Sequence, residues 1–374
     1  MIHYIDTVII GGGPSGLSCA LILQKNNISN IVIEKREFPR EKTCGGLITN
    51  KTFKLISQNL GLADIEISSE IICDLSNIVE LYYKNKLLTT SVISDKLRFV
   101  KRATFVNYLA TKYKEIGGKL LENCSYTVLD LENHKIELTS GEIIEFEHIV
   151  VADGALSKTR KNLGYKTPEL GFCVETFIPK SKLQNTEHVK IYFGIVEKGY
   201  AWIFPSGNEI CIGLGGVYKK GVNYKAVLEE FLVSLGVNQN DYKIKGAFVP
   251  YGKPVNQKHG MSDDVILVGD AAGFVDPIHG EGLYFAIKSG IAAANAIING
   301  KSKQEYLKQI LPILKTIKQG DKLQNLFFQK SILQLFQKII IGKDLLVAFY
   351  CDNQVSEYNY SYLNLWKFFW DYYF

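Results

Sequence analysis

The spacing of apolar positions along the chain predicts buried strands that alternate with helices. Short apolar runs rich in β-branched residues predict strands that are buried on both faces, at residues 4–10, 30–33, 148–151 and 264–268. The first run leads into a glycine cluster and a helical stretch over 17–24, and the last precedes a helix of small residues over 283–299. This alternation is typical of an α/β fold with a mostly parallel sheet.

Two other regions, residues 66–97 and 166–261, show a different pattern. Their short runs alternate between apolar and polar positions, for instance over 188–193 and 209–214, which predicts antiparallel strands. Because both regions are inserted between the α/β pieces, we expect a second domain that is discontinuous in sequence. Toward the C-terminus the pattern becomes helical, with an amphipathic stretch over 331–350.

Composition indicates an ordinary globular protein of more than one domain. The chain has 374 residues, of which 47% are hydrophobic and 22% charged, and its formal charge is +5. The lysines are scattered singly, so no basic stripe indicates a nucleic-acid partner. Seven cysteines without a C-x-x-C pair argue against a disulfide framework or a zinc site, so we expect no metal and a reducing cytoplasm. We also expect neither a secretory signal nor a bilayer-spanning segment.

The glycine cluster has the form G-x-G-x-x-G, over Gly11, Gly12, Gly13, Pro14, Ser15 and Gly16. Gly11 allows a tight turn, Gly13 lets a pyrophosphate approach the backbone, and Gly16 lets the helix pack closely on the strand. Glu34 ends the next strand, where an acidic residue can accept hydrogen bonds from a ribose. Together these features predict a bound dinucleotide, with a ligand-free glycine turn and a solvated glutamate as the alternative.

A second glycine-rich turn follows the run at 264–268. Asp270, which follows Gly269, can accept hydrogen bonds from ribityl hydroxyls. Gly280 and Gly282 then open a helix whose N-terminus favours an anion. Two such turns far apart in sequence suit a long cofactor with two halves, which is the shape of FAD. Since the sequence holds no second G-x-G-x-x-G, we expect electrons to come from transiently docked NAD(P)H or from a small electron-transfer protein.

These motifs together resemble the fingerprint of the p-hydroxybenzoate hydroxylase-like flavoproteins. The resemblance spans roughly residues 1–300 and is carried by the first glycine cluster, Glu34, Arg102, Asp153, Gly154, Gly269 and Asp270. It implies a Rossmann-type FAD-binding domain with Glu34 at the adenosine ribose, Arg102 at the phosphate–ribose region, Asp153 and Gly154 near the pyrophosphate, Asp270 at the ribityl chain, and Gly280 and Gly282 beside the isoalloxazine. Val106 stands where the family often has an acid, which leaves that local contact open.

Basic residues of the same segments are further candidates for cofactor contacts. The chain has five arginines against 38 lysines, and Arg36, Arg40 and Arg102 lie in segments expected to line the cofactor. A planar guanidinium suits phosphate and ring contacts better than an ammonium does. The predicted set of cofactor contacts is completed by Lys35, Cys44 and Gly45.

Two further segments resemble the geranylgeranyl reductases of this flavoprotein class. Residues 39–46, P-R-E-K-T-C-G-G, resemble their P-x-x-K-x-C-G-G element, and residues 200–205, Y-A-W-I-F-P, resemble the Y-x-W-x-F-P motif associated with their substrate channel. On a strand, Tyr200, Trp202 and Phe204 would face the same side and form a wall for a long isoprenoid chain. The alternatives are an aromatic core stripe and the similar W-x-W-x-I-P segment of flavin-dependent halogenases.

Cys44 and His279 are the two candidates for catalysis. Cys44 would lie near the flavin, where a thiol could position the loop or act as a redox partner. A packed, inert thiol is the alternative. His279 precedes Gly280 and could donate a proton to a substrate over the ring, although a histidine at this place could equally cap the helix.

The expected domains follow from these patterns and the resemblance. They are a discontinuous FAD-binding domain over 1–65, 98–165 and 262–300, a substrate domain of antiparallel strands over 66–97 and 166–261, and a C-terminal helical segment over 301–374. Ten of the last 17 residues are aromatic. We expect this tail to pack on the body, with closure of a lipid pocket or contact with a membrane interface as the alternatives.

The resemblance implies an FAD-dependent reductase that saturates carbon–carbon double bonds of a long apolar, prenyl substrate. Hydride would pass from the reduced flavin to one alkene carbon, and a proton to the other. A flavin-dependent monooxygenase or halogenase that acts on a smaller, aromatic substrate is the alternative, and a flavin-binding scaffold is a third. We expect a cytoplasmic protein, either free or in peripheral contact with a membrane.

Overall fold

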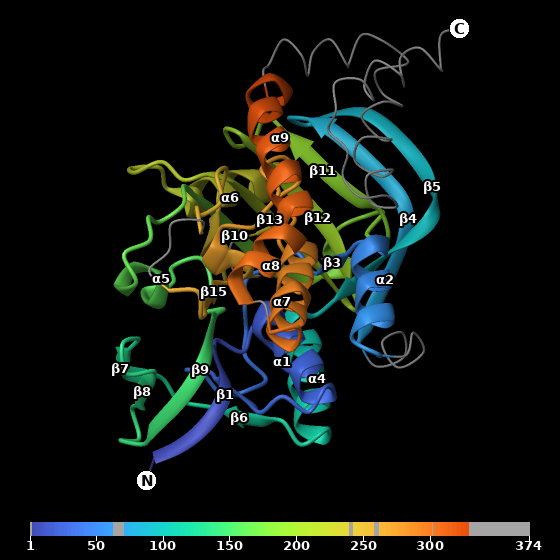
Figure 1. Cartoon of the computed structure of the whole chain (residues 1–374). Helices are drawn as coiled ribbons and strands as arrows, with labels where there is room; N and C mark the ends of the chain where they lie inside the picture. Colours follow the sequence, from blue (N-terminus) through green and yellow to red (C-terminus); the bar gives the residue numbers. More distant parts are fainter. Residues whose placement is uncertain (1, 63–70, 239–241, 258–261, 301, 329–374) are drawn as a thin grey trace, which may run out of the picture.

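The computed structural model describes residues 2–62, 71–238, 242–257, 262–300 and 302–328 (Figure 1). The predicted amphipathic stretch over 331–350 and the aromatic tail lie outside these ranges, so their packing stays a prediction. Within the ranges, no helix combines the length and apolar character that a membrane crossing requires. One sheet occupies the lower half of Figure 1 and a second sheet the upper half.

The first sheet is built around the strand that the sequence predicts near the N-terminus. β1 (Ile2–Ile10) pairs in parallel with β2 (Asn30–Ile33) and β9 (Ile143–Val151). Further parallel pairs join β6 (Lys119–Leu121) to β2 and β15 (Val265–Leu267) to β9. An antiparallel edge is added by β8 (Lys135–Leu138) and β7 (Tyr126–Asp130). The predicted α/β fold with a mostly parallel sheet is thus confirmed.

Helices place the two glycine-rich turns of this sheet side by side. α1 (Pro14–Lys25) begins at the first turn, α7 (Leu283–Ile298) begins after the second, and α4 (Arg102–Glu115) packs beside α1. The backbones of α1 and α7 approach closely because Gly290 has no side chain, and a Cβ there would lie 2.2 Å from the carbonyl oxygen of Ser15. This contact brings together turns that are far apart in sequence.

In the described ranges, the second sheet has eight strands in the order β14-β10-β13-β12-β11-β4-β5-β3. Their bounds are β3 (Leu47–Ile48), β4 (Ile72–Tyr83), β5 (Lys86–Val100), β10 (Leu170–Pro179), β11 (Val189–Phe193), β12 (Gly199–Ser206), β13 (Glu209–Val217) and β14 (Lys245–Pro250). One pair departs from the predicted antiparallel pattern, because β11 and β4 run parallel. Here two separate chain segments meet, and since no hairpin joins them, no tight turn dictates an antiparallel direction.

The two faces of the second sheet have different surroundings. On one face, Val174, Ile212 and Leu214 form a small core with α6 (Tyr224–Ser234). The residues that alternate with them, among them Cys173 and Glu175, line a cavity that residues of both sheets share. The other α-helices of the described residues are α2 (Asn50–Asn59), α5 (Lys158–Asn162), α8 (Ser302–Gln309) and α9 (Leu311–Phe327).

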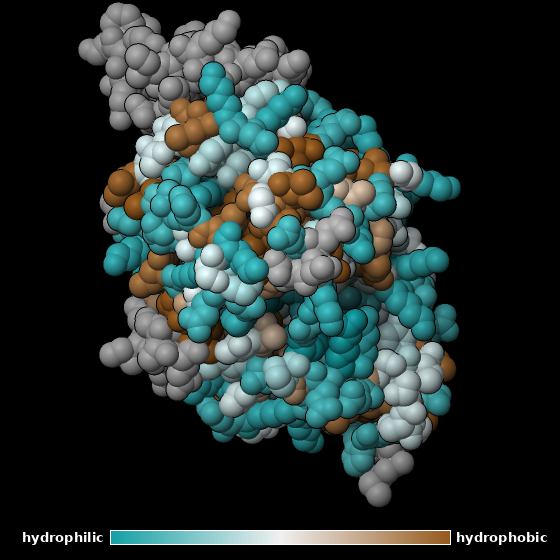
Figure 2. Space-filling model, turned by 180° about the vertical axis from the view of Figure 1, so that it is seen from behind, coloured by the Kyte–Doolittle hydropathy of each residue, from teal (hydrophilic) through white to brown (hydrophobic). Residues whose placement is uncertain are grey.

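The outer surface also differs between the two halves. Figure 2 shows the molecule from behind, where hydrophobic residues gather on the half that contains the second sheet and the lower half is mostly hydrophilic. In the part of the chain that the structure describes, no group of three or more His, Cys, Asp or Glu side chains could hold a metal ion.

Candidate functional site

The shared cavity has a volume of about 750 Å³ and collects most of the residues that the sequence singled out. The predicted residues that line it are Gly11, Gly13, Pro14, Ser15, Glu34, Lys35, Arg36, Arg40, Cys44, Gly45, Arg102, Asp153, Gly154, Tyr200, Trp202, Phe204, Asp270, His279, Gly280 and Gly282. Gly16 and Gly269 are not among the lining residues. Both are packing positions, since a Cβ on Gly16 would lie 2.1 Å from the Gly11 carbonyl oxygen and one on Gly269 2.8 Å from Ser15 Oγ.

The first glycine turn presents backbone rather than side chains to the cavity. Gly11 has φ +110°, and a Cβ there would lie 2.4 Å from the carbonyl oxygen of Ala152, so only glycine fits. At Gly13 the nearest atom to a Cβ would be Arg40 Nη2 at 3.9 Å, which leaves the turn open. No side chain caps the N-terminus of α1. Its first-turn N–H groups are therefore available to an anion.

Glu34 is held rigidly at the end of β2. Its Oε2 accepts a hydrogen bond from the Gly12 N–H at 2.9 Å, and its Oε1 accepts one from the Arg36 N–H at 3.1 Å. Arg40 Nη2 lies 3.1 Å from Oε2. Burial lowers the pKa of Arg40, while the Glu34 carboxylate beside it opposes this shift. The carboxylate is thereby oriented at the edge of the cavity, as an acceptor for a ribose requires.

Two partly buried side chains on the cavity wall hold buried polar atoms that the described residues leave without a partner. Arg102 Nε and Nη1 and Asp153 Oδ1 have no hydrogen-bond partner among the described residues. The other oxygen of Asp153 accepts from the N–H of Thr159 at 3.1 Å and from its hydroxyl at 2.9 Å. Because buried polar groups are normally paired, a ligand with anionic oxygens and hydroxyl groups is the natural partner. These atoms and the open glycine turn therefore fit FAD.

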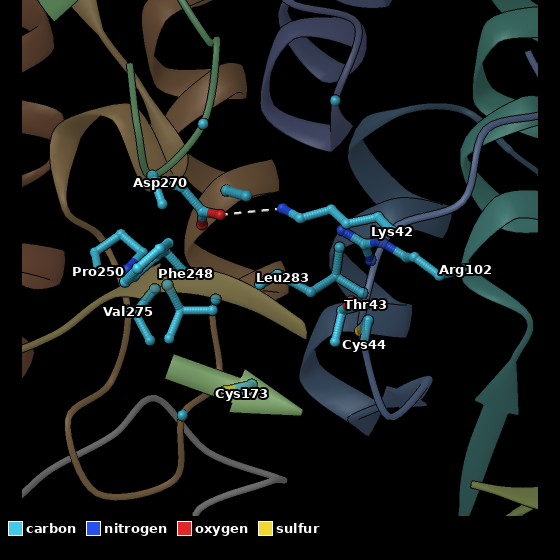
Figure 3. Close-up of a pocket in the computed structure, with 18 of the residues that line it drawn as sticks. Lys42, Thr43, Cys44, Arg102, Cys173, Phe248, Pro250, Asp270, Val275 and Leu283 are labelled. Atoms are coloured by element: carbon cyan, nitrogen blue, oxygen red, sulfur yellow. Dashed lines mark hydrogen bonds and ion pairs between the residues drawn. The ribbon is translucent and has the colours of Figure 1, made fainter. Parts of the chain in front are cut away.

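The second turn, Gly269–Ala272, carries Asp270 into the cavity, where Lys42 Nζ lies 3.0 Å from its Oδ2 (Figure 3). The turn is locked from behind by Arg160, a residue that sequence analysis did not propose for the site. Its fully buried guanidinium donates to the carbonyl oxygen of Ala271 at 3.0 Å and to that of Ala155 at 2.9 Å. One side chain thus joins the turns after β9 and β15.

The loop before α7 is fixed by two carboxylates. Asp276 Oδ1 accepts from the N–H of His279 at 2.7 Å and lies 3.0 Å from its Nδ1. Glu281 is held by Lys51 Nζ at 2.8 Å and by the hydroxyl of Thr49 at 2.8 Å. Burial lowers the pKa of Lys51, and Glu281 opposes the shift. No sequence pattern predicted this ionic cluster, because Lys51 and Glu281 lie 230 positions apart and belong to no shared motif.

The opposite wall of the cavity carries aromatic side chains from β12, which pack over a glycine of the neighbouring strand β13. Tyr200, Trp202 and Phe204 follow one another on β12, with successive ring centroids 6.0 and 6.1 Å apart. The Trp202 ring covers Gly213, where a Cβ would lie 2.4 Å from it. The Tyr200 hydroxyl donates to the carbonyl oxygen of His279, which ties this wall to the loop before α7. Beyond Phe204 the lining continues with Val79, Leu97, Val189 and Ile191.

Glu175 faces the cavity from β10 and was also missed. Its Oε1 accepts from the Cys44 N–H at 2.7 Å. The residue is only 3% exposed. Burial raises the pKa of Glu175 to about 7, although the Cys44 N–H, the Cys211 thiol and Lys245 each favour the carboxylate. Burial also raises the pKa of the neighbouring Cys173 thiol to about 12. A single glutamate in an alternating strand carries no sequence signal of this environment.

The sequence of this chain is similar to those of known proteins. Residues 4–176 match the family model described as FAD binding domain. The chain is 32% identical over 309 residues to an uncharacterized protein of Methanosarcina barkeri, covering 82% of this chain and 78% of that protein. It is 28% identical over 327 residues to a digeranylgeranylglycerophospholipid reductase of Methanococcus vannielii, covering 82% and 80% of the two chains.

Solved structures share the fold. A geranylgeranyl bacteriochlorophyll reductase-like protein from Thermoplasma acidophilum superposes with a TM-score of 0.73 at 20% identity, covering 93% of this chain and 96% of that one. PqsL, a probable FAD-dependent monooxygenase from Pseudomonas aeruginosa, gives a TM-score of 0.67 at 16% identity, covering 88% and 98%. At such identities the likeness concerns the fold alone.

Proposed function

Because the chain is an FAD-dependent oxidoreductase that belongs to the geranylgeranyl reductase family, we propose that it saturates carbon–carbon double bonds of a long apolar prenyl chain. The observation that carries this proposal is the continuous apolar lining that begins at Tyr200 and Trp202 and extends past Phe204 to β4, β5 and β11. A small aromatic substrate would leave most of this lining uncovered. The name of the Methanococcus vannielii relative also points to prenyl lipids.

The residues that would hold FAD lie on the side of the first sheet. The glycine turn at Gly11 and Gly13 would receive the pyrophosphate, Glu34 the adenosine ribose, and Asp270 the ribityl chain. Arg102 would donate hydrogen bonds to phosphate oxygens, and Asp153 would accept them from sugar hydroxyls. The loop with Gly280 and Gly282 would lie beside the ring. When bound and reduced, FAD supplies a hydride.

The substrate side would orient the alkene and exclude water. Trp202 and Phe204 offer flat apolar surface to a prenyl chain, and the missing side chain at Gly213 lets the Trp202 ring lie close to the sheet. An unactivated alkene has no carbonyl to polarise, so placement and a proton donor matter most. Cys44 and His279 border this space and remain candidates, Cys44 for loop positioning or as a redox partner and His279 for proton delivery.

An anaerobic single-turnover assay tests the proposed reaction. The FAD-loaded protein is reduced chemically, mixed with a geranylgeranyl lipid without oxygen, and followed by flavin absorbance and by mass spectrometry of the lipid. We expect reoxidation in step with a gain of two hydrogens per double bond. Reoxidation only after air is admitted, with an oxygenated product, would instead assign a monooxygenase, and halide incorporation would assign a halogenase.

The source of electrons is a separate part of the proposal. We infer that reduced nicotinamide dinucleotide or a small electron-transfer protein reduces the flavin. Stopped-flow reduction of the loaded protein by NADH, by NADPH and by a reduced ferredoxin ranks these donors. Failure of all three would overturn this part and leave the lipid reaction, which is tested with chemical reductant, untouched.

A further inference from the structure

Glu175 lies in the middle of the second sheet, in line with the aromatic wall. In the strand register it is paired with Gly213 of β13, which is in turn paired with Trp202 of β12. Paired residues point to the same face of a sheet. Because Gly213 has no side chain, nothing on the middle strand stands between the Trp202 ring and the Glu175 carboxyl. The acid and the indole therefore border one part of the cavity.

The polar contacts of the Glu175 carboxyl are with a backbone N–H and a thiol, and neither group carries a positive charge. Its Oε1 accepts the Cys44 N–H at 2.7 Å, and its Oε2 lies 3.8 Å from the Cys211 thiol. The titratable groups facing it are Cys173 of its own strand, Cys211 of β13, Cys44 of the loop and Lys245 of β14.

The one cation among these groups is turned to another partner. Lys245 forms an ion pair with Glu41, and no ion pair joins it to Glu175 in the described part of the chain. A buried carboxyl without a paired cation favours its neutral, protonated form. Its pKa of about 7 leaves it poised to give up a proton near neutral pH.

We propose that Glu175 is the acid that delivers a proton to the double bond, an inference that rests on the proposed function. One alkene carbon would receive a hydride, with its two electrons, that FAD would supply when bound and reduced. The O–H bond of Glu175 breaks and its proton joins the other carbon, so that the π bond becomes two C–H bonds. Oxidised flavin and the Glu175 carboxylate remain, and the carboxylate takes a proton from solvent before the next turnover.

Other acidic groups on the same wall are less suited to this step. Burial raises the pKa of Cys173 to about 12 and that of Tyr200 well above its usual range, so neither gives up a proton readily near pH 7. His279 lies on the loop before α7 and not on the strands that flank Trp202, with its Nδ1 3.0 Å from Asp276 Oδ1. Glu175 thus combines a matched pKa with a place beside Trp202.

The variant Glu175→Gln distinguishes a role of Glu175 as an acid from a purely structural role. Glutamine keeps an oxygen that can accept the Cys44 N–H but has no acidic proton. In the prereduced, FAD-loaded protein, we expect anaerobic reduction of a geranylgeranyl lipid to slow by about 10²- to 10⁴-fold. Glu230→Gln, which removes a carboxylate from the exposed face of α6, is the matched control and should react like the parent.

The pH profile and the infrared spectrum provide readouts that a purely structural role would not move. The parent rate should fall as pH rises through about 7, and this limb should disappear in Glu175→Gln. Independently of activity, the carbonyl stretch of a protonated carboxyl should titrate near pH 7 in the parent, with or without FAD, and be missing from the variant.

The outcomes distinguish the two proposals. If the parent protein reduces the lipid and Glu175→Gln does so at the same rate with the same pH profile, Glu175 is not the acid. If the infrared band is absent from the parent near neutral pH, the carboxyl is ionised and the inference also fails. If the parent protein itself leaves the lipid unchanged while the band titrates as expected, the proposed function has failed and the protonation of Glu175 stands.

Discussion

The two walls of the cavity offer different physical means of binding a ligand. The wall on the first sheet uses backbone groups and charge, with an uncapped helix N-terminus at Gly13 and carboxylates at Glu34 and Asp270. The wall on the second sheet uses aromatic rings, glycine gaps and one buried acid. Polar recognition of this kind fixes a cofactor in one orientation. An apolar wall instead binds an apolar chain in proportion to the surface area that is buried, and this interaction does not depend on direction.

The largest expected effect comes from the ionic link that fixes the loop before α7. In Lys51→Met, the Glu281 carboxylate keeps the Thr49 hydroxyl but loses its buried cation. Removing one partner of a buried pair typically destabilises by about 3–5 kcal/mol. We expect a loss of this size in urea-induced unfolding, together with weaker FAD binding. The double variant Lys51→Met/Glu281→Gln should regain much of the stability, and failure to do so would show that lysine packing, not charge, is what matters.

The next effect tests the buried acid of the second sheet through stability alone. The pKa of Glu175 is raised from 4.5 to about 7 in the folded protein. Between these values the folded state holds a proton that the unfolded chain has lost, so stability falls as pH rises through this window. Glu175→Gln lacks this loss, and its stability relative to the parent should improve by about 3 kcal/mol between about pH 4 and pH 8. A pH-independent difference in urea unfolding would contradict the raised pKa.

The smallest effect compares the two walls directly. Asp270→Ala removes an acceptor on the cofactor side, and each lost hydrogen bond to a charged group is worth about 1.5–3 kcal/mol. We expect the dissociation constant of FAD, measured by fluorescence, to rise by about 10- to 150-fold. Trp202→Phe should leave that constant unchanged and impair only the use of long substrates. Equal loss of FAD in both variants would contradict the division into a cofactor wall and a substrate wall.

This division also decides what could be predicted from sequence. The turn at Gly11 and the acceptor at Glu34 belong to a short local motif, because a strand, a turn and a helix N-terminus follow one another directly in the chain. The fold of the first sheet follows from the same pattern, which predicted the parallel strands β1, β2, β9 and β15 but not the short β6.

In the second sheet, by contrast, the important side chains could not be predicted from a local motif. Glu175 acquires its environment from β13, β14 and the Cys44 loop, and these contacts depend on strand order and register. Arg160 and Lys51 likewise act across contacts that no local pattern encodes. The parallel pairing of β11 with β4 has the same origin, since two remote segments meet there without a turn to set their direction.

The ion pair of Lys42 with Asp270 spans the space between the walls. Lys42 Nζ contacts only Oδ2 of Asp270, so a sugar hydroxyl can bind the carboxylate through Oδ1 while the ion pair stays in place. Lys42 stands two positions before Cys44, whose backbone N–H holds Glu175. Thr43 alone thus separates the residue that holds the carboxylate of one wall from the residue that holds the carboxyl of the other.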